Sequence, residues 1–173
     1  MRILSKIIIF LIALQCTPAA AQIRPFVSGA LVYAKVNEMG VGNRAEPSFS
    51  YGLFAKKDKV ISSLSTNRGI EQISSRKTNT GLVSRSKATS DNLLIGYAFN
   101  RFAPSLIISN TRVKKRLENG DRILAEKSLS AILTGANFTY FITPKISVST
   151  FYIMPSSKLN LNYAVGTSLN LIF

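Results

Sequence analysis

The ionisable and nucleophilic side chains of this sequence limit the chemistry that it can perform. The 173 residues include no histidine and one cysteine, Cys16. A Ser–His–Asp triad, a Cys–His pair, a histidine-bound zinc and a cysteine-cluster metal site are therefore excluded. Carboxylate pairs remain, but the acidic residues fall mostly between the segments of regular hydrophobic pattern, where solvated carboxylates are the simpler interpretation. We expect no catalytic residue, no metal, no cofactor and no enzymatic activity.

Basic side chains are the more numerous charged group, and they could bind anions. Lysine and arginine number 22 against 8 acidic residues, for a formal charge of +14. Several lie in two polar segments, 67–88 and 114–126, which we expect to be loops. The candidates are Arg68, Arg76, Lys77, Arg85, Lys87, Lys114, Lys115 and Arg116. Such groups bind phosphate or sulfate through charge-assisted hydrogen bonds, although solvated loops of a basic protein would look the same. Aromatic residues do not alternate with these cations, which argues against specific nucleic-acid binding.

The first 21 residues have the pattern of a secretory signal peptide. Arg2 and Lys6 precede an unbroken apolar run over 7–14, and Ala19-Ala20-Ala21 supplies small residues for cleavage. The apolar run is too short to span a membrane. We therefore predict a signal peptide over 1–21 and a single exported domain over 22–173.

The rest of the chain shows alternation with a period of two, which is typical of strands with two different environments. In 129–141, for example, one face carries Ile132, Thr134, Ala136, Phe138 and Tyr140, and the other carries Leu133, Gly135, Asn137 and Thr139. The pattern predicts eight strands, at 24–36, 48–56, 60–66, 91–100, 102–113, 129–141, 145–154 and 159–173.

The connections between these segments alternate in length. Short turns are expected at Lys57-Asp58-Lys59, Asn100-Arg101 and Thr143-Pro144, and long connections lie between them. This alternation indicates an up-and-down antiparallel sheet. Eight such strands can close, and closure is required in lipid, where unpaired backbone groups are costly. We therefore predict an all-β fold, an eight-stranded antiparallel up-and-down transmembrane β-barrel.

Side chains can also be assigned to the two faces of this barrel. Small residues suit the narrow interior; the expected set is Gly96, Gly135, Asn162, Gly166 and Ser168, with the apolar residues of 159–173, Leu159 included, on the outside. Aromatic residues near the short turns predict an interfacial girdle; they are Tyr97, Phe99, Phe102, Tyr140, Phe141 and Phe173.

At this point the chain resembles the small outer-membrane β-barrels of the OmpA/OmpX-like, porin-family group of Gram-negative bacteria. The resemblance rests on the signal peptide, the strand 93–99, the turn 140–147 and the last strand. It implies that Tyr163, Leu169, Leu171 and Phe173 form a signal for the barrel-assembly machinery. Ser168 stands where that group usually has glycine.

The expected function is a structural or surface-interaction role in the cell outer membrane. Partners would be outer-membrane lipid and lipopolysaccharide, the assembly machinery, and a host or extracellular anionic ligand. A narrow porin-like channel and a soluble secreted ligand-binding barrel are the alternatives. A single-channel current in a planar bilayer would identify the channel, and folding without detergent would identify the soluble barrel.

Overall fold

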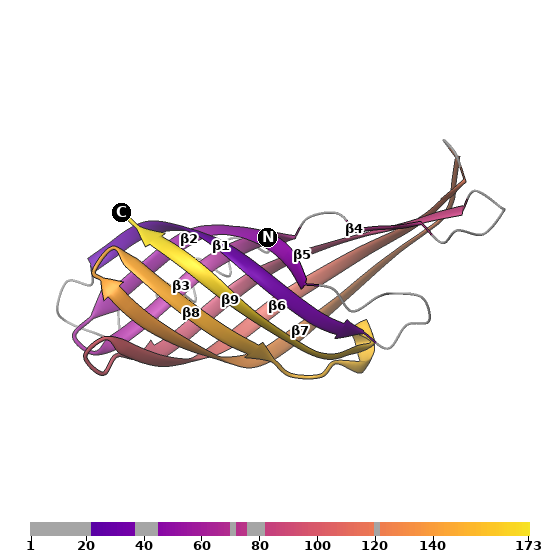
Figure 1. Cartoon of the computed structure of the whole chain (residues 1–173). Helices are drawn as coiled ribbons and strands as arrows, with labels where there is room; N and C mark the ends of the chain where they lie inside the picture. Colours follow the sequence, from indigo (N-terminus) through magenta and orange to yellow (C-terminus); the bar gives the residue numbers. More distant parts are fainter. Residues whose placement is uncertain (1–21, 37–44, 70–71, 76–81, 120–121) are drawn as a thin grey trace, which may run out of the picture.

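The computed structural model describes residues 22–36, 45–69, 72–75, 82–119 and 122–173. The predicted signal peptide lies outside these ranges. The described residues form nine strands and one 3-10 helix, arranged as an elongated barrel (Figure 1). The elements are β1 (Gln22–Val36), β2 (Ala45–Lys57), β3 (Val60–Gly69), β4 (Gln72–Ser75), β5 (Leu82–Tyr97), β6 (Phe102–Asn119), β7 (Arg122–Thr143), β8 (Ile146–Ile153), η1 (Ser157–Leu159) and β9 (Leu161–Ile172). No helix in the described ranges is long and apolar enough to cross a membrane.

Eight of these strands close into a ring. Every pairing is antiparallel; β1 pairs with both β2 and β9, and the additional pairing between β3 and β5 closes the circle. The order around the ring is therefore β1-β2-β3-β5-β6-β7-β8-β9. The predicted eight-stranded antiparallel barrel is confirmed. The ninth strand, β4, pairs with β5 farther from the ring than β3 does, because β4 faces 83–86 and β3 faces 89–97.

Three tight turns gather at one end of the barrel, which we call the short-turn end. Asp58 and Asn100 adopt left-handed backbone angles, with φ of 51° and 54°, which suit the two turns that join β2 to β3 and β5 to β6. A turn at Pro144 and Lys145 joins β7 to β8, where the Thr143 hydroxyl accepts hydrogen bonds from the amides of Lys145 and Ile146. All three predicted short turns are confirmed.

The two faces of each strand follow the sequence alternation. From Ala131 to Tyr140, β7 strictly alternates buried and exposed residues, with Leu133 inside and Ile132 outside. The small residues Gly135, Gly166 and Ser168 face the interior as expected. The pattern arises because successive side chains on a strand point to opposite sides.

Three side-chain placements were wrong. Leu161, expected on the outside, lines the lumen and packs against the buried cluster that includes Leu133, because the register with β1 shifts between Lys35 and Val36. Leu159 does not lie on the outer face of a strand, because it ends η1 and is 7% exposed inside the barrel. The left-handed residue that follows it, Asn160, reverses the chain direction and resets the alternation. Phe141 does not join the girdle either. It follows the outward-facing Tyr140, so the period of two turns it inward, where its ring lies 6.1 Å from that of Phe54.

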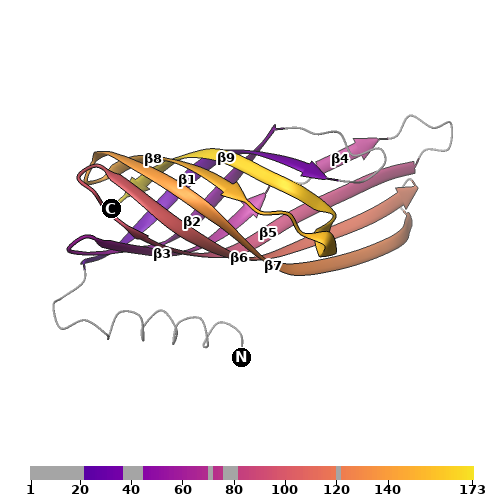
Figure 2. The same cartoon turned by 90° about the horizontal axis from the view of Figure 1, so that it is seen from below.

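The expectation that 67–88 and 114–126 are loops was also largely wrong. Most described residues of these segments belong to β4, β5, β6 and β7, which continue beyond the ring as an open sheet that we call the extension. Figure 1 shows the extension projecting from the end opposite the short turns, and Figure 2 shows it from below. These residues are mainly serine, lysine, arginine and glutamate, so the segments carry no hydrophobic alternation. Their strands depend on backbone pairing with neighbours.

An apolar cluster fills the lumen near the short-turn end. Ile61, Ala98 and Ala103 are at most 5% exposed, and Phe54 and Phe141 pack against them. These residues come from opposite parts of the chain and meet only because the sheet closes. We call this cluster the floor of the lumen.

Candidate functional site

The outer surface of the ring carries a belt of exposed apolar side chains. Ile132 is 74% exposed and Leu31 is 61% exposed, and Leu106 and Leu169 are each at least half exposed. Apolar side chains are not isolated on this surface, because they recur at the outward position of strand after strand. Soluble proteins seldom expose a continuous surface of this kind. The belt matches the lipid-facing surface of a transmembrane barrel.

An aromatic girdle borders the belt at the short-turn end. Tyr97 and Phe99 contact each other with ring centroids 4.7 Å apart. The ring of Phe102 lies 5.0 Å from that of Tyr140 and 5.6 Å from that of Phe138. Aromatic side chains favour the membrane–water interface, since their rings pack with acyl chains while their polar edges reach water.

A second girdle, which sequence analysis missed, borders the belt at the extension end. Tyr163 contacts Tyr33 at 6.2 Å and Tyr152 at 6.4 Å, and Phe49 contacts Tyr51 at 6.4 Å on β2. These residues come from β1, β2, β8 and β9, which are neighbours in the sheet, so the pairing of the two ends of the chain through β1 and β9 brings them together. Between Tyr163 and Phe173, ten positions apart, the chain rises about 33 Å at ~3.3 Å per residue. A strand tilt of about 40° reduces this to about 25 Å, the height of the apolar band in outer-membrane barrels.

Basic side chains of β3 and β6 lie on the outward surface at the level of this second girdle. Phe49 pairs across the sheet with Arg68, Arg68 with Thr89, and Thr89 with Arg112. The guanidinium of Arg68 lies 5.9 Å from the ring centre of Tyr51. Arg68 and Arg112 therefore share one cross-strand row with an aromatic residue of the girdle.

The next two rows, farther from the belt, contain pairs of like charge. Lys87 on β5 lies opposite Lys114 on β6, and Arg85 lies opposite Arg116. All four share the outward face with Ile108. Lys114 and Arg116 lie an even number of positions from Ile108 on β6, and Arg85 and Lys87 lie an even number of positions from Leu93, which faces Ile108 on β5. We call the outward surface formed by Arg68, Arg85, Lys87, Arg112, Lys114 and Arg116 the cationic face. Opposed like charges destabilise a sheet unless counter-charges are near.

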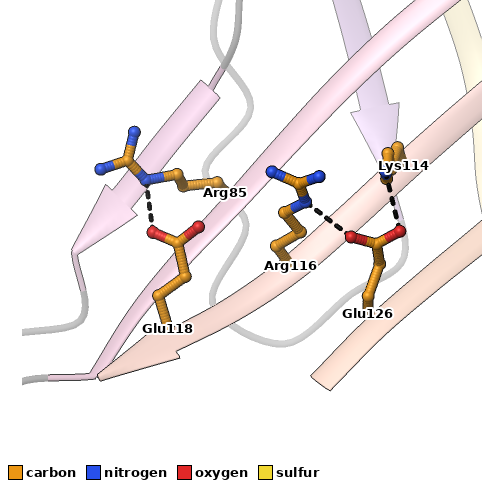
Figure 3. A network of polar contacts seen from close by, with 5 residues as sticks. All are labelled: Arg85, Lys114, Arg116, Glu118 and Glu126. Atoms are coloured by element: carbon orange, nitrogen blue, oxygen red, sulfur yellow. Dashed lines mark hydrogen bonds and ion pairs between the residues drawn. The ribbon is translucent and has the colours of Figure 1, made fainter. Parts of the chain in front are cut away.

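Two carboxylates partly neutralise the cationic face (Figure 3). Glu126 of β7 pairs through Oε1 with Lys114 Nζ at 2.8 Å and through Oε2 with Arg116 Nε at 2.7 Å. Glu118 pairs with Arg85 Nε at 2.8 Å. Hydrogen bonds from Lys114 and then from Arg116 lower the pKa of Glu126 below its usual 4.5. This carboxylate therefore stays charged when the medium becomes moderately acidic.

Two cations of the face have no such partner. Among the residues that the structure describes, neither Lys87 nor Arg112 forms an ion pair. Both are exposed, and both lie in the two rows nearest the girdle. The cationic face therefore keeps an excess of positive charge directly beside the apolar belt.

The fold resembles those of solved bacterial outer-membrane proteins. Ail, the attachment invasion locus protein of Yersinia pestis, solved in complex with the heparin analogue sucrose octasulfate, superimposes with a TM-score of 0.65 and 12% identity, covering 90% of this chain and all of that one. Neisserial surface protein A matches with a TM-score of 0.55 and 10% identity over 90% of this chain and all of its own. The N-terminal β-barrel domain of Pseudomonas aeruginosa OprF matches with a TM-score of 0.53 and 11% identity over 88% and 100%. No family model and no curated protein sequence matches the chain.

This chain folds as a small outer-membrane β-barrel. The architecture expected from the OmpA/OmpX-like resemblance is thereby confirmed. At these low identities the likeness concerns the fold and not a shared ligand.

Arg85, Lys87, Lys114 and Arg116 come together on the cationic face, and Arg68 lies at its border with the girdle. Lys115 does not join them, because the alternation of β6 turns it to the inner face. Arg76 and Lys77 lie outside the described residues.

Arg112 is the member of the cationic face that sequence analysis missed. It lies inside the predicted strand 102–113, just before the polar segment 114–126 in which the basic cluster is expected. The signal for it is the even spacing of Arg112, Lys114 and Arg116, which places three cations on one face of a strand.

The residues of the predicted assembly signal occupy the outer face of β9. Leu169, Leu171 and Phe173 are between 42% and 65% exposed, and Tyr163 belongs to the girdle at the extension end. The amide of Phe173 donates to the carbonyl of Pro25, so the chain end is tied to β1 at the seam of the ring. Recognition by an assembly machinery stays a prediction.

The acidic residues do not form a reactive cluster. Within the described ranges, no group of three or more histidine, cysteine, aspartate or glutamate side chains lies close enough to hold a metal ion. Glu118 and Glu126 serve as ion-pair partners on the extension. The arrangement of charged groups is therefore suited to binding anions.

Proposed function

We propose that the protein resides in the outer membrane and binds polyanions, with the phosphates of lipopolysaccharide as the preferred ligand, through the cationic face. The role is structural or adhesive and does not involve catalysis. The observation that carries the proposal is the position of Arg68, Lys87 and Arg112, in the first two rows beside an aromatic girdle.

The position of these cations favours a ligand at the membrane surface. The aromatic girdle marks the level of lipid headgroups. The cationic face is the direct continuation of the lipid-facing surface, so its side chains point toward neighbouring lipids and not toward the lumen. Phosphates carried by lipids in the same leaflet would lie at this height.

Charge repulsion within the face also favours an anionic ligand. Lys87 faces Lys114 and Arg85 faces Arg116 across one pair of strands, and among the described residues the ion pairs of Glu118 and Glu126 neutralise only part of this charge. A phosphate between two such cations would convert repulsion into charge-assisted hydrogen bonds. Binding would therefore relieve a cost that is present in the free protein.

A soluble sulfated polysaccharide is the second candidate ligand. The crystal structure of Ail contains a heparin analogue, and sulfate and phosphate groups are recognised by the same side chains. The floor of the lumen argues against the porin alternative, because Ile61, Ala98 and Ala103 fill the interior at the short-turn end.

Lipopolysaccharide titration tests the proposal. The barrel in neutral micelles is titrated with intact or enzymatically dephosphorylated lipopolysaccharide, and amide resonances of β5 and β6 are followed at two salt concentrations. The triple variant Arg68→Gln, Lys87→Gln, Arg112→Gln removes three cations without breaking an ion pair. The matched control, Lys56→Gln, Lys57→Gln, Lys59→Gln, removes the same charge at the short-turn end.

We expect intact lipopolysaccharide to bind the wild type and the control alike, and the triple variant more weakly with a smaller salt effect. Equal binding by both variants, or equal binding of the dephosphorylated form, would refute the proposal. Heparin is titrated in parallel. A response to heparin alone would assign the face to a soluble polyanion.

A further inference from the structure

The lumen contains a cavity of about 360 Å³. Its lining reaches Glu46 and Lys115 at the extension end, and none of the buried floor residues Ile61, Ala98 and Ala103 contributes to it. It is therefore a blind pocket that opens toward the extension. Its volume falls within the range of about 300–1,000 Å³ typical of small-molecule sites.

One wall of this cavity consists of small hydroxyl and amide side chains. Ser50 of β2, Ser65 of β3, and Ser90 and Asn92 of β5 line it. No described residue forms a hydrogen bond with any of these four side chains. Asn67 lies on the same wall; its Nδ2 donates to Ser48 at 3.5 Å, while its buried Oδ1 has no partner among the described residues. Buried polar atoms without partners are rare in folded proteins and call for an explanation.

The opposite wall is aliphatic. Leu133, Ile153 and Leu159 are 6–8% exposed and form one packed cluster that faces the cavity. In the ring order β1-β2-β3-β5-β6-β7-β8-β9, β7 and β8 stand half-way round from β2 and β3. The hydroxyl wall and the aliphatic wall thus face each other across the lumen.

Formal charge is confined to the mouth of the cavity. Among its lining residues only Glu46 and Lys115 are charged, one of each sign, and both lie toward the extension. Deeper, the side chains of Asn137, Thr139, Ser149 and Asn170 form a network of neutral groups. An ionised ligand would lose its hydration there without gaining a counter-charge.

We infer that the lumen is a binding pocket for an uncharged amphiphile, with hydroxyl or amide groups on the serine-rich wall and an aliphatic part on the wall of Leu133, Ile153 and Leu159. The carbonyl of Asn67 would accept a hydrogen bond from the ligand. The occupant differs from a polyanion in charge and location, so this inference does not depend on the proposed function.

Six-carbon probes of different charge test the pocket. The isotope-labelled barrel in nanodiscs is titrated with hexane-1,2-diol, hexanoate or hexylammonium. Shifts are followed at the Ser65 amide and the Ile153 methyl groups in the lumen, and at the Ile132 methyl groups on the lipid-facing surface. Lumen resonances report binding, whereas the Ile132 signals report partitioning into the lipid.

Two pairs of variants keep the inference falsifiable. Ala30→Phe fills the cavity, and its control Ala136→Phe adds the same ring to the lipid-facing surface. Ser65→Ala removes a hydroxyl from the polar wall, and its control Ser62→Ala removes one from the other face of the same strand. The serine pair remains informative if Ala30→Phe does not fold.

We expect the diol to shift the lumen resonances saturably and to bind at least about tenfold more tightly than either ion. Ala30→Phe should abolish this response, and Ser65→Ala should weaken it about threefold, whereas both controls should match the wild type. Equal affinity for all three probes, shifts confined to Ile132, or an unchanged response in both Ala30→Phe and Ser65→Ala would overturn the inference.

Discussion

Lys87 on β5 lies directly opposite Lys114 on β6, just above the aromatic girdle at the extension end. Only Lys114 of this pair has a carboxylate partner, Glu126, within the described residues. A pair of this kind lowers the stability of the bare sheet and creates a site for an anion. Stability of the extension and affinity for polyanions should therefore change in opposite directions.

Lys87→Glu tests this opposition. Replacing one lysine of the pair with glutamate converts repulsion into attraction, worth about 0.2–1 kcal/mol for a cross-strand pair. We expect slower amide hydrogen exchange over 83–88 and 112–117, together with weaker lipopolysaccharide binding. Lys87→Gln should fall between the wild type and Lys87→Glu in both measurements. Faster exchange with unchanged binding would contradict the assignment.

Glu126 should make the extension sensitive to acid. Lys114 and Arg116 lower the pKa of Glu126, so this carboxylate binds protons less readily in the folded than in the unfolded state. Its contribution is therefore complete above the usual pKa of 4.5 and is lost as the pH falls through the lowered folded value. Hydrogen-exchange protection factors of β6 and β7, which correct for the intrinsic pH dependence of exchange, should fall in that window for the wild type, and Glu126→Gln should remove this fall. An NMR titration that gives the Glu126 carboxylate a pKa at or above 4.5 would count against this prediction.

Leu169 and Ser168 provide a test of the two faces of β9. Leu169 is 50% exposed on the apolar belt, whereas Ser168 lines the lumen and donates to Asn170. Leu169→Arg should cost about 2–4 kcal/mol, since the charge would lie in the hydrocarbon layer. Ser168→Ala should cost less than about 1 kcal/mol. The measurement is denaturant unfolding in lipid vesicles, and equal tolerance of both changes would refute the face assignment.

Gly166 should be intolerant of a side chain. A Cβ added there would lie 2.8 Å from the carbonyl oxygen of Leu31 and would also collide with the ring of Phe151. Gly166→Ala should therefore destabilise the barrel by about 1–3 kcal/mol through overpacking. Gly29, on the paired strand β1, has no atom within 4 Å of such a Cβ, so Gly29→Ala is the matched control. Unfolding free energies that change equally would disprove the packing argument.

The floor of the lumen should prevent conduction. Phe54 and Phe141 pack against Ile61, Ala98 and Ala103 across the interior, and the cavity does not extend among those three buried residues. The protein in a planar bilayer should therefore give no steady ohmic current. Persistent single-channel steps from heat-modifiable, folded protein would restore the porin alternative.

Much of the barrel could be predicted from the sequence alone. The alternation in 129–141 and 159–173 predicted that Gly135, Gly166 and Ser168 face the inside and that Leu169 faces the outside, because the period of a strand is independent of its partners. The positions of Asp58 and Asn100 marked tight turns, since asparagine and aspartate tolerate left-handed backbone angles.

The tertiary structure decided the features that depend on strand partners. The extension is made of polar strands without a hydrophobic pattern, and only pairing with neighbours orders them. That pairing places Arg68, Lys87 and Arg112 from three strands beside one girdle and turns Lys115 away from them. Closure of the ring brings the serine-rich wall opposite Leu133 and Ile153. Sequence periodicity determines which face a side chain occupies, whereas register and closure determine what it meets there.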